Sequence, residues 1–139
     1  MSTPILPTEL VTISPARRLL THTAIGTARV LATRSPARIR TVLARLGRGV
    51  RPATYAETSR AHNTVLQVSP RCCGTNACLV RSIATVLLCR AEGSWPTWCV
   101  GVILAPPFAA HAWVEAEGRL VNEPVDRTRY GRLITVGTD

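Results

Sequence analysis

The sequence predicts a mixed α+β fold, in which a basic helical region precedes one central helix that packs on a small antiparallel sheet. Three patterns support this prediction. Apolar residues recur at helical spacing over residues 77–90, β-forming residues dominate residues 98–104, and two further β-rich segments flank a turn that contains Gly118. We therefore divide the chain into a basic helical region, residues 1–66, and an α+β core, residues 67–139.

The N-terminal region is expected to form helices over residues 16–32, 36–46 and 52–66. All 17 basic residues of the chain are arginines, against eight acidic residues, and they concentrate before residue 61. A net charge of +9 favours a docking surface for an acidic protein or peptide. A solvated helical face is the alternative. Nucleic acid is disfavoured, because Tyr55 is the only aromatic residue in this region and no binding motif is present.

Two uncharged segments resemble export or membrane signals, and neither is expected to act as one. Arg17 and Arg18 precede an uncharged run, residues 19–28, but polar residues interrupt it and further arginines follow. Residues 93–114 also lack charge, but three prolines and His111 interrupt them, so we expect strands and a loop there rather than a membrane span. With no secretory signal and an odd number of cysteines, we expect a cytoplasmic protein with reduced thiols.

The helix over residues 77–90 is expected to carry a reactive thiol. Thr75 and Asn76 are residue types that favour a helix N-cap, and Gly93 fits a C-terminal stop. Cys78 then lies in the first turn, where backbone N–H groups without intrahelical partners and the positive end of the helix dipole stabilise an anion. A thiolate is therefore favoured at this position.

A β-hairpin is expected after the strand of residues 98–104, with its own strands at residues 111–115 and 119–123. We favour a three-residue loop, residues 116–118, because such a loop places glycine in the left-handed conformation at its last position. In this register His111 faces Glu123. The other opposed pairs are Trp113 with Val121 and Glu115 with Arg119. A two-residue turn would instead put Glu123 opposite Ala112, on the wrong face for His111.

A thiol at a helix start, an imidazole on a strand and a carboxylate on the next strand suit acyl transfer. Cys78 would attack a carbonyl, His111 would move the proton, and Glu123 would hold the imidazole tautomer. The backbone N–H of Cys78 is a candidate oxyanion donor, and the second donor is not identified by the sequence.

The remaining cysteines and histidines are expected to be structural. Cys72, Cys73 and Cys78 lack the spacing of a zinc site and no second ligand pair follows, so we expect neither a metal nor a cofactor. Small buried cysteine is the commoner role for the others, Cys89 and Cys99 included. His22 and His62, in the arginine-rich region, are both expected at the surface.

Three segments carry a family resemblance: residues 78–85 (CLVRSIAT), 95–102 (WPTWCVGV) and 107–115 (PFAAHAWVE), with weaker support from residues 49–55, 68–72 and 121–124. On these, the chain from residue 70 to about 136 resembles the leader peptidases of lasso peptide biosynthesis, a transglutaminase-like family of cysteine peptidases. The resemblance implies a papain/transglutaminase-like core and a catalytic set of Cys78, His111 and Glu123. The family's third catalytic residue is often aspartate, so Asp126 is the fallback for Glu123.

The resemblance also implies partners. The substrate would be a ribosomally made precursor peptide, and a separate recognition element protein would capture its leader, because residues 1–66 have a helical pattern and leave no room for a winged-helix domain that begins with strands. A lasso cyclase, which closes the ring after cleavage, is a further possible partner. Two other functions stay open: an acyltransferase in which an amine resolves the thioester, and a non-catalytic adaptor whose basic helices gather the precursor and the enzymes.

Overall fold

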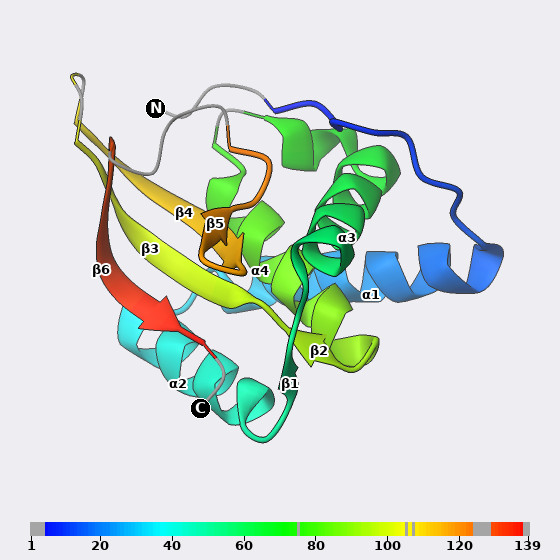
Figure 1. Cartoon of the computed structure of the whole chain (residues 1–139), viewed down its shortest axis with the longest axis horizontal. Coiled ribbons are helices and arrows are strands. Elements are labelled where there is room, and N and C mark those ends of the chain that lie inside the picture. Colours follow the sequence, from blue (N-terminus) through cyan, green and yellow to red (C-terminus); the bar gives the residue numbers. More distant parts are fainter. Residues whose placement is uncertain (1–4, 75, 105, 107, 124–128, 138–139) are drawn as a thin grey trace.

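The computed structural model describes residues 5–74, 76–104, 106, 108–123 and 129–137 (Figure 1). Its elements are α1 (Pro15–Leu31), α2 (Pro36–Gly47), β1 (Arg51–Pro52), α3 (Tyr55–Val68), a short 3-10 helix η1 (Pro70–Cys73), α4 (Cys78–Ala91), β2 (Ser94–Trp95), β3 (Thr97–Ile103), β4 (Ala109–Ala116), β5 (Arg119–Leu120) and β6 (Tyr130–Val136). The predicted α+β class is confirmed. No helix in the described ranges is long and apolar enough to cross a membrane.

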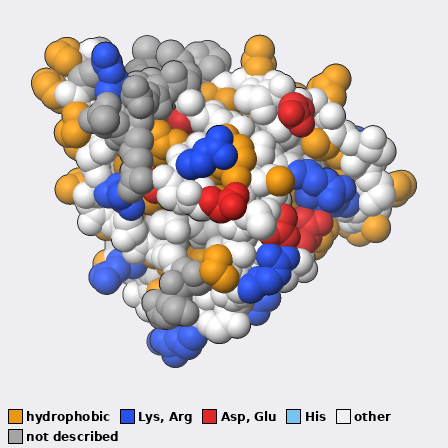
Figure 2. All heavy atoms as spheres, in the orientation of Figure 1, with side chains coloured by type: hydrophobic (Ala, Val, Ile, Leu, Met, Phe, Trp, Pro, Cys, Tyr) orange, Lys and Arg blue, Asp and Glu red, His pale blue; other side chains and the backbone are white. Residues whose placement is uncertain are grey.

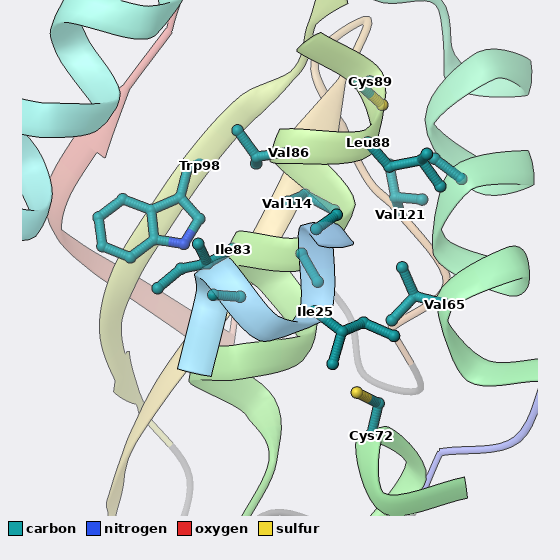
Figure 3. Close-up of a cluster of buried hydrophobic side chains, with 14 of the residues drawn as sticks. Ile25, Val65, Cys72, Ile83, Val86, Leu88, Cys89, Trp98, Val114 and Val121 are labelled. Carbon is teal, nitrogen blue, oxygen red and sulfur yellow. The ribbon is translucent and has the colours of Figure 1, made fainter. Parts of the chain in front are cut away.

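Helix α4 is the centre of the fold. It packs on β3 and β4 of an antiparallel sheet with the strand order β5-β4-β3-β6, and α1 and α3 pack against it in turn. α2 lies beside β6 at the edge of the sheet (Figure 1). Figure 3 shows the resulting core, in which Ile25 of α1, Val65 of α3, Ile83 of α4 and Val114 of β4 lie in one buried cluster. The N-terminal helices and the sheet therefore share a single apolar core.

Side-chain caps decide where the first two helices begin. Ser14 before α1 and Ser35 before α2 each accept a hydrogen bond from the backbone N–H three residues on, and a proline follows each cap. The helices predicted over residues 16–32 and 36–46 are confirmed to within one residue at each end. Caps of this kind are visible in a sequence because they involve only neighbouring residues.

The third predicted helix, over residues 52–66, was placed too early. α3 begins at Tyr55, because Thr54 and Glu57 form a capping box: the Thr54 side chain accepts from the Glu57 N–H, and the Glu57 carboxylate accepts from the Thr54 N–H at 3.0 Å. Residues 51–52 instead form β1, which pairs in parallel with β2.

We predict that Thr54→Ala lowers the free energy of unfolding by about 1 kcal/mol, because the substitution leaves the Glu57 N–H without its cap. Urea denaturation measures the change. Thr41→Ala is the matched control, since Thr41 is an exposed residue of α2 whose hydroxyl donates to the Ala37 carbonyl, and loss of this bond should change stability little. Equal effects of the two substitutions would contradict the capping role.

Strand β6 was not predicted. It pairs with β3 at an edge of the sheet, and the register of this pairing shifts between Val100 and Gly101. Buried and exposed side chains therefore do not alternate regularly along β6, and an apolar residue, Leu133, is 74% exposed. A Cβ at residue 101 would overlap the carbonyl oxygen of Gly131, and only glycine allows this close approach of β3 and β6.

Candidate active site

Cys78 is the first residue of α4, as the sequence predicted to within one residue. The N-cap is Ala77, which supplies no side-chain hydrogen bond, so the predicted capping role of Asn76 is wrong. Thr75 lies outside the described residues. The Cys78 side chain is half-buried, at the helix end where exposed N–H groups favour an anion.

The hairpin register differs from the predicted one. Ala116 pairs with Arg119 and Glu115 with Leu120, which makes a two-residue turn at Glu117 and Gly118. Both turn residues have positive φ, 54° and 73°, as a type I′ turn requires. The three-residue loop, with Glu115 opposite Arg119 and Trp113 opposite Val121, was therefore wrong. The two-residue turn is preferred over the three-residue loop because its backbone twist matches that of the two strands. This preference holds although the turn places Glu117 in the left-handed region.

Glu123 reaches His111 in spite of this register. β5 ends at Leu120, and Asn122 has φ of 54°, so the chain turns out of the ladder before Glu123. Beyond this turn, side chains no longer alternate between the two faces of the sheet, so the register does not decide where Glu123 points. The Glu123 Oε1 accepts a hydrogen bond from His111 Nε2, and both side chains are only 3% exposed. The predicted proximity of these two side chains is present, but for a reason other than cross-strand pairing.

The imidazole of His111 lies between the thiol and the carboxylate. Its second nitrogen, Nδ1, is buried and has no hydrogen-bond partner at contact distance among the described residues. Burial opposes the charged form of His111, but interactions with Cys78 and Glu123 outweigh it and raise the pKa to about 9. Burial likewise opposes the thiolate of Cys78, yet the His111 imidazole and the Ala112 backbone N–H leave the thiol pKa below its ordinary value. The pair is thus polarised toward thiolate and imidazolium.

Two aromatic rings enclose the imidazole. Trp113 stacks on His111 with ring centroids 5.9 Å apart, and its place on the same face of β4 is as predicted. Tyr130, on the unpredicted strand β6, packs against His111 at 5.6 Å and donates a hydrogen bond to Glu123 Oε1 at 3.3 Å. Burial and the nearby Glu123 raise the pKa of the Tyr130 phenol, which keeps it a donor. With these rings against them and only 3% of each side chain exposed, His111 and Glu123 are shielded from bulk solvent.

A contact from α3 holds the turn that carries Glu123. The Asn122 amide hydrogen-bonds His62 Nδ1 at 3.3 Å and Ser59 at 3.1 Å. His62 was predicted at the surface and is 3% exposed, so that prediction is wrong. Burial and then Arg81 lower its pKa to about 3, so it remains neutral. The sequence held a signal, since His62 lies four residues after Thr58 on the buried stripe of α3.

The remaining predicted residues lie outside the His111 cluster or outside the described residues. Asp126, the fallback acid, lies outside the described residues. His22 is exposed on α1, as predicted. Cys72, Cys89 and Cys99 are buried, and none of the five cysteines, all within the described ranges, forms a disulfide. Among described residues, no group of three or more histidine, cysteine or acidic side chains is arranged to hold a metal ion.

A groove of about 410 Å³ opens beside the carboxylate end of this cluster. Its lining comes from the N-terminal segment, α3 and the hairpin: Ile5, Leu6, Thr8, Tyr55, Leu120, Asn122 and Glu123. The mixture of aliphatic, aromatic and amide groups suits a peptide chain, because apolar side chains and main-chain amides can both find partners there.

Comparison with known proteins relates the chain to one family. A family model of the transglutaminase-like superfamily matches residues 22–135, which include α3, α4 and the antiparallel sheet except for the last residue of β6. No curated protein and no solved structure gives a significant match.

Proposed function

Because this chain belongs to the transglutaminase-like superfamily, we propose that it is a cysteine peptidase that removes the leader from a ribosomally made lasso peptide precursor. The observation that carries the proposal is that the His111 imidazole lies between the Cys78 thiol, at the start of α4, and the Glu123 carboxylate. The resemblance of residues 78–85, 95–102 and 107–115 to the lasso leader peptidases supports the substrate class.

The proposed reaction passes through a thioester. The Cys78 thiolate adds to the carbonyl carbon of the scissile amide, and the backbone N–H of Cys78 is available to the oxyanion. The His111 imidazolium gives its proton to the leaving nitrogen as the carbon–nitrogen bond breaks. Water then attacks the thioester while His111 accepts a proton, and breakage of the carbon–sulfur bond restores the thiolate. Glu123 holds the tautomer and orientation of His111 throughout.

The proposed partners are the precursor peptide, a separate recognition element protein that captures the leader, and the lasso cyclase. The arginine-rich helices supply a docking surface for an acidic protein or peptide, because Arg38 and Arg45 of α2 border a groove of about 530 Å³. On the face that Figure 2 shows, arginines lie in separate groups, several of them beside acidic side chains, which suits several separate ion pairs better than one polyanion.

The test is incubation of the purified chain with a precursor from its own gene neighbourhood, with and without the recognition protein, followed by intact mass measurement. Release of leader and core whose masses sum to the mass of the precursor plus one water supports the peptidase. Products joined to an amine identify an acyltransferase instead, and an uncut precursor under all conditions leaves only the adaptor. Full-rate cleavage without any partner would contradict the proposed need for a recognition protein.

The rate of cleavage should follow a bell-shaped curve against pH. Activity needs Cys78 deprotonated and His111 protonated, so it rises as pH passes the lowered pKa of Cys78 and falls as His111 loses its proton at a pKa of about 9. Measurement of kcat/KM across the pH range gives both limbs. An alkaline limb near the ordinary histidine pKa of about 6.5 would show that the ion pair does not form.

A further inference from the structure

Arg81 is a charged side chain in the core that the proposed reaction does not use. It lies one turn after Cys78 on α4 and is 2% exposed. Its Nη1 donates to the carbonyl of Cys72 at 2.8 Å and to that of Gly74 at 3.4 Å. Its Nη2 is buried and has no hydrogen-bond partner among the described residues. A buried guanidinium is costly unless anions or acceptors compensate it, so its surroundings must supply them.

A small cavity connects Arg81 with the acid of the candidate active site. It is lined by His62, Arg81, Ser82, Ala112, Trp113, Val114, Val121 and Glu123, and it has room for a single water molecule. Arg81 and Glu123 are the charged members of this lining. A water there would accept a hydrogen bond from the orphaned Nη2 and donate one to the Glu123 carboxylate.

Among the described residues at this end of α4, the charges balance only when Arg81 is counted. The Cys78 thiolate and the Glu123 carboxylate are two anions, and the His111 imidazolium is one cation. His62 is neutral because its pKa is lowered to about 3, and the raised pKa of Tyr130 keeps the phenol neutral. On the far side of Trp113, Glu115 has its own cation in Arg132 at 3.6 Å.

We propose that Arg81 is a positioning residue that supplies the second positive charge of the site, through space to the Cys78 thiolate and through one bound water to the Glu123 carboxylate. The proposal rests on the proposed thiol chemistry. It also agrees with the direction in which Arg81 acts on its neighbours, since its charge lowers the pKa of Cys78. A thiolate in a half-buried site needs such a cation because burial alone raises its free energy.

The alternative role is structural: Arg81 ties the segment of residues 72–74 to α4, just before a helix start that has no side-chain cap. The substitution Arg81→Lys distinguishes the electrostatic role from the structural one. Lysine keeps the positive charge, but one ammonium does not reproduce the guanidinium fork. An electrostatic role therefore survives this substitution, and a structural one does not.

The test measures alkylation of Cys78 by iodoacetamide as a function of pH, with peptide mass spectrometry to isolate that cysteine, and needs no peptide substrate. We expect Arg81→Gln to slow alkylation near pH 7 by about three- to tenfold and to move the profile to higher pH. Arg81→Lys should keep the wild-type profile even where its melting temperature falls. Arg71→Gln, which removes an exposed arginine from η1, is the matched control and should change nothing.

A folded Arg81→Gln variant with a wild-type profile would overturn the proposal. If Arg81→Gln does not fold, Arg81→Lys decides: a tenfold loss of thiol reactivity in a folded lysine variant would assign Arg81 a purely structural role. These outcomes leave the peptidase proposal intact, because that proposal fails only on the products formed from precursor. A crystal structure of the wild-type chain tests the water directly, and a dry cavity between Arg81 and Glu123 would remove the bridge.

Discussion

Cys78→Ala should abolish cleavage of the precursor, with a loss of about 10⁴-fold or more, while the chain stays folded. The thiol is the nucleophile in the proposed reaction, and the neighbouring His111 imidazole lowers its pKa. The side chain is only half-buried at a helix start, and alanine is a good helix former, so stability should change by about 1 kcal/mol at most. Intact mass measurement of precursor incubated with the variant and the recognition protein gives the result.

Cys73→Ala is the matched control for this experiment. Cys73 is also partly exposed and lies five residues earlier, but burial raises the pKa of its thiol, so it is a poor nucleophile. Its removal should leave cleavage nearly unchanged, as should that of Cys72. Cleavage by Cys78→Ala at the wild-type rate would end the proposed chemistry, whereas lost cleavage with retained binding of precursor would support it.

His111→Ala should lower kcat by about 10³-fold or more and slow alkylation of Cys78 near neutral pH. The imidazole is the strongest of the groups that lower the pKa of Cys78, so without it burial dominates and the thiol becomes more basic. One substitution therefore removes both the proton carrier and the stabiliser of the thiolate. Cleavage assays and alkylation at Cys78 measure the two effects separately.

His22→Ala serves as the control, because His22 is exposed on α1 and is not among the groups that shift the pKa of Cys78 or of His111. It should leave both rates unchanged. If His111→Ala slowed cleavage but left thiol reactivity as in the wild type, the inferred thiolate–imidazolium pair would be wrong even though His111 served as a proton carrier.

Local patterns determined much of this fold. Ser14, Ser35 and the helical spacing of apolar residues in α4 involve only residues a few positions apart, so the sequence shows them directly. The same holds for the position of Cys78 at a helix start. Even so, the choice between a two-residue and a three-residue turn at Gly118 rested on small local preferences, and the preference for the longer loop was wrong.

Residues far apart in the sequence decided the rest. Residue 101 must be glycine because the backbone carbonyl of residue 131 on β6 lies against it, and no local pattern marks that approach. Tyr130 contributes a phenol to the site from that same strand.

The sequence by itself predicted the α+β class, the helices except for the start of α3, and Cys78, His111 and Glu123 as the candidate site residues. Tertiary structure decided how Glu123 meets His111: a left-handed Asn122 ends strand pairing, and α3 holds that turn through His62. The tertiary structure also decided that Arg81 is buried beside the cavity that Glu123 lines. The physical reason is that caps and periodicity act between near neighbours in the chain, whereas burial and charge balance depend on everything that packs around a group.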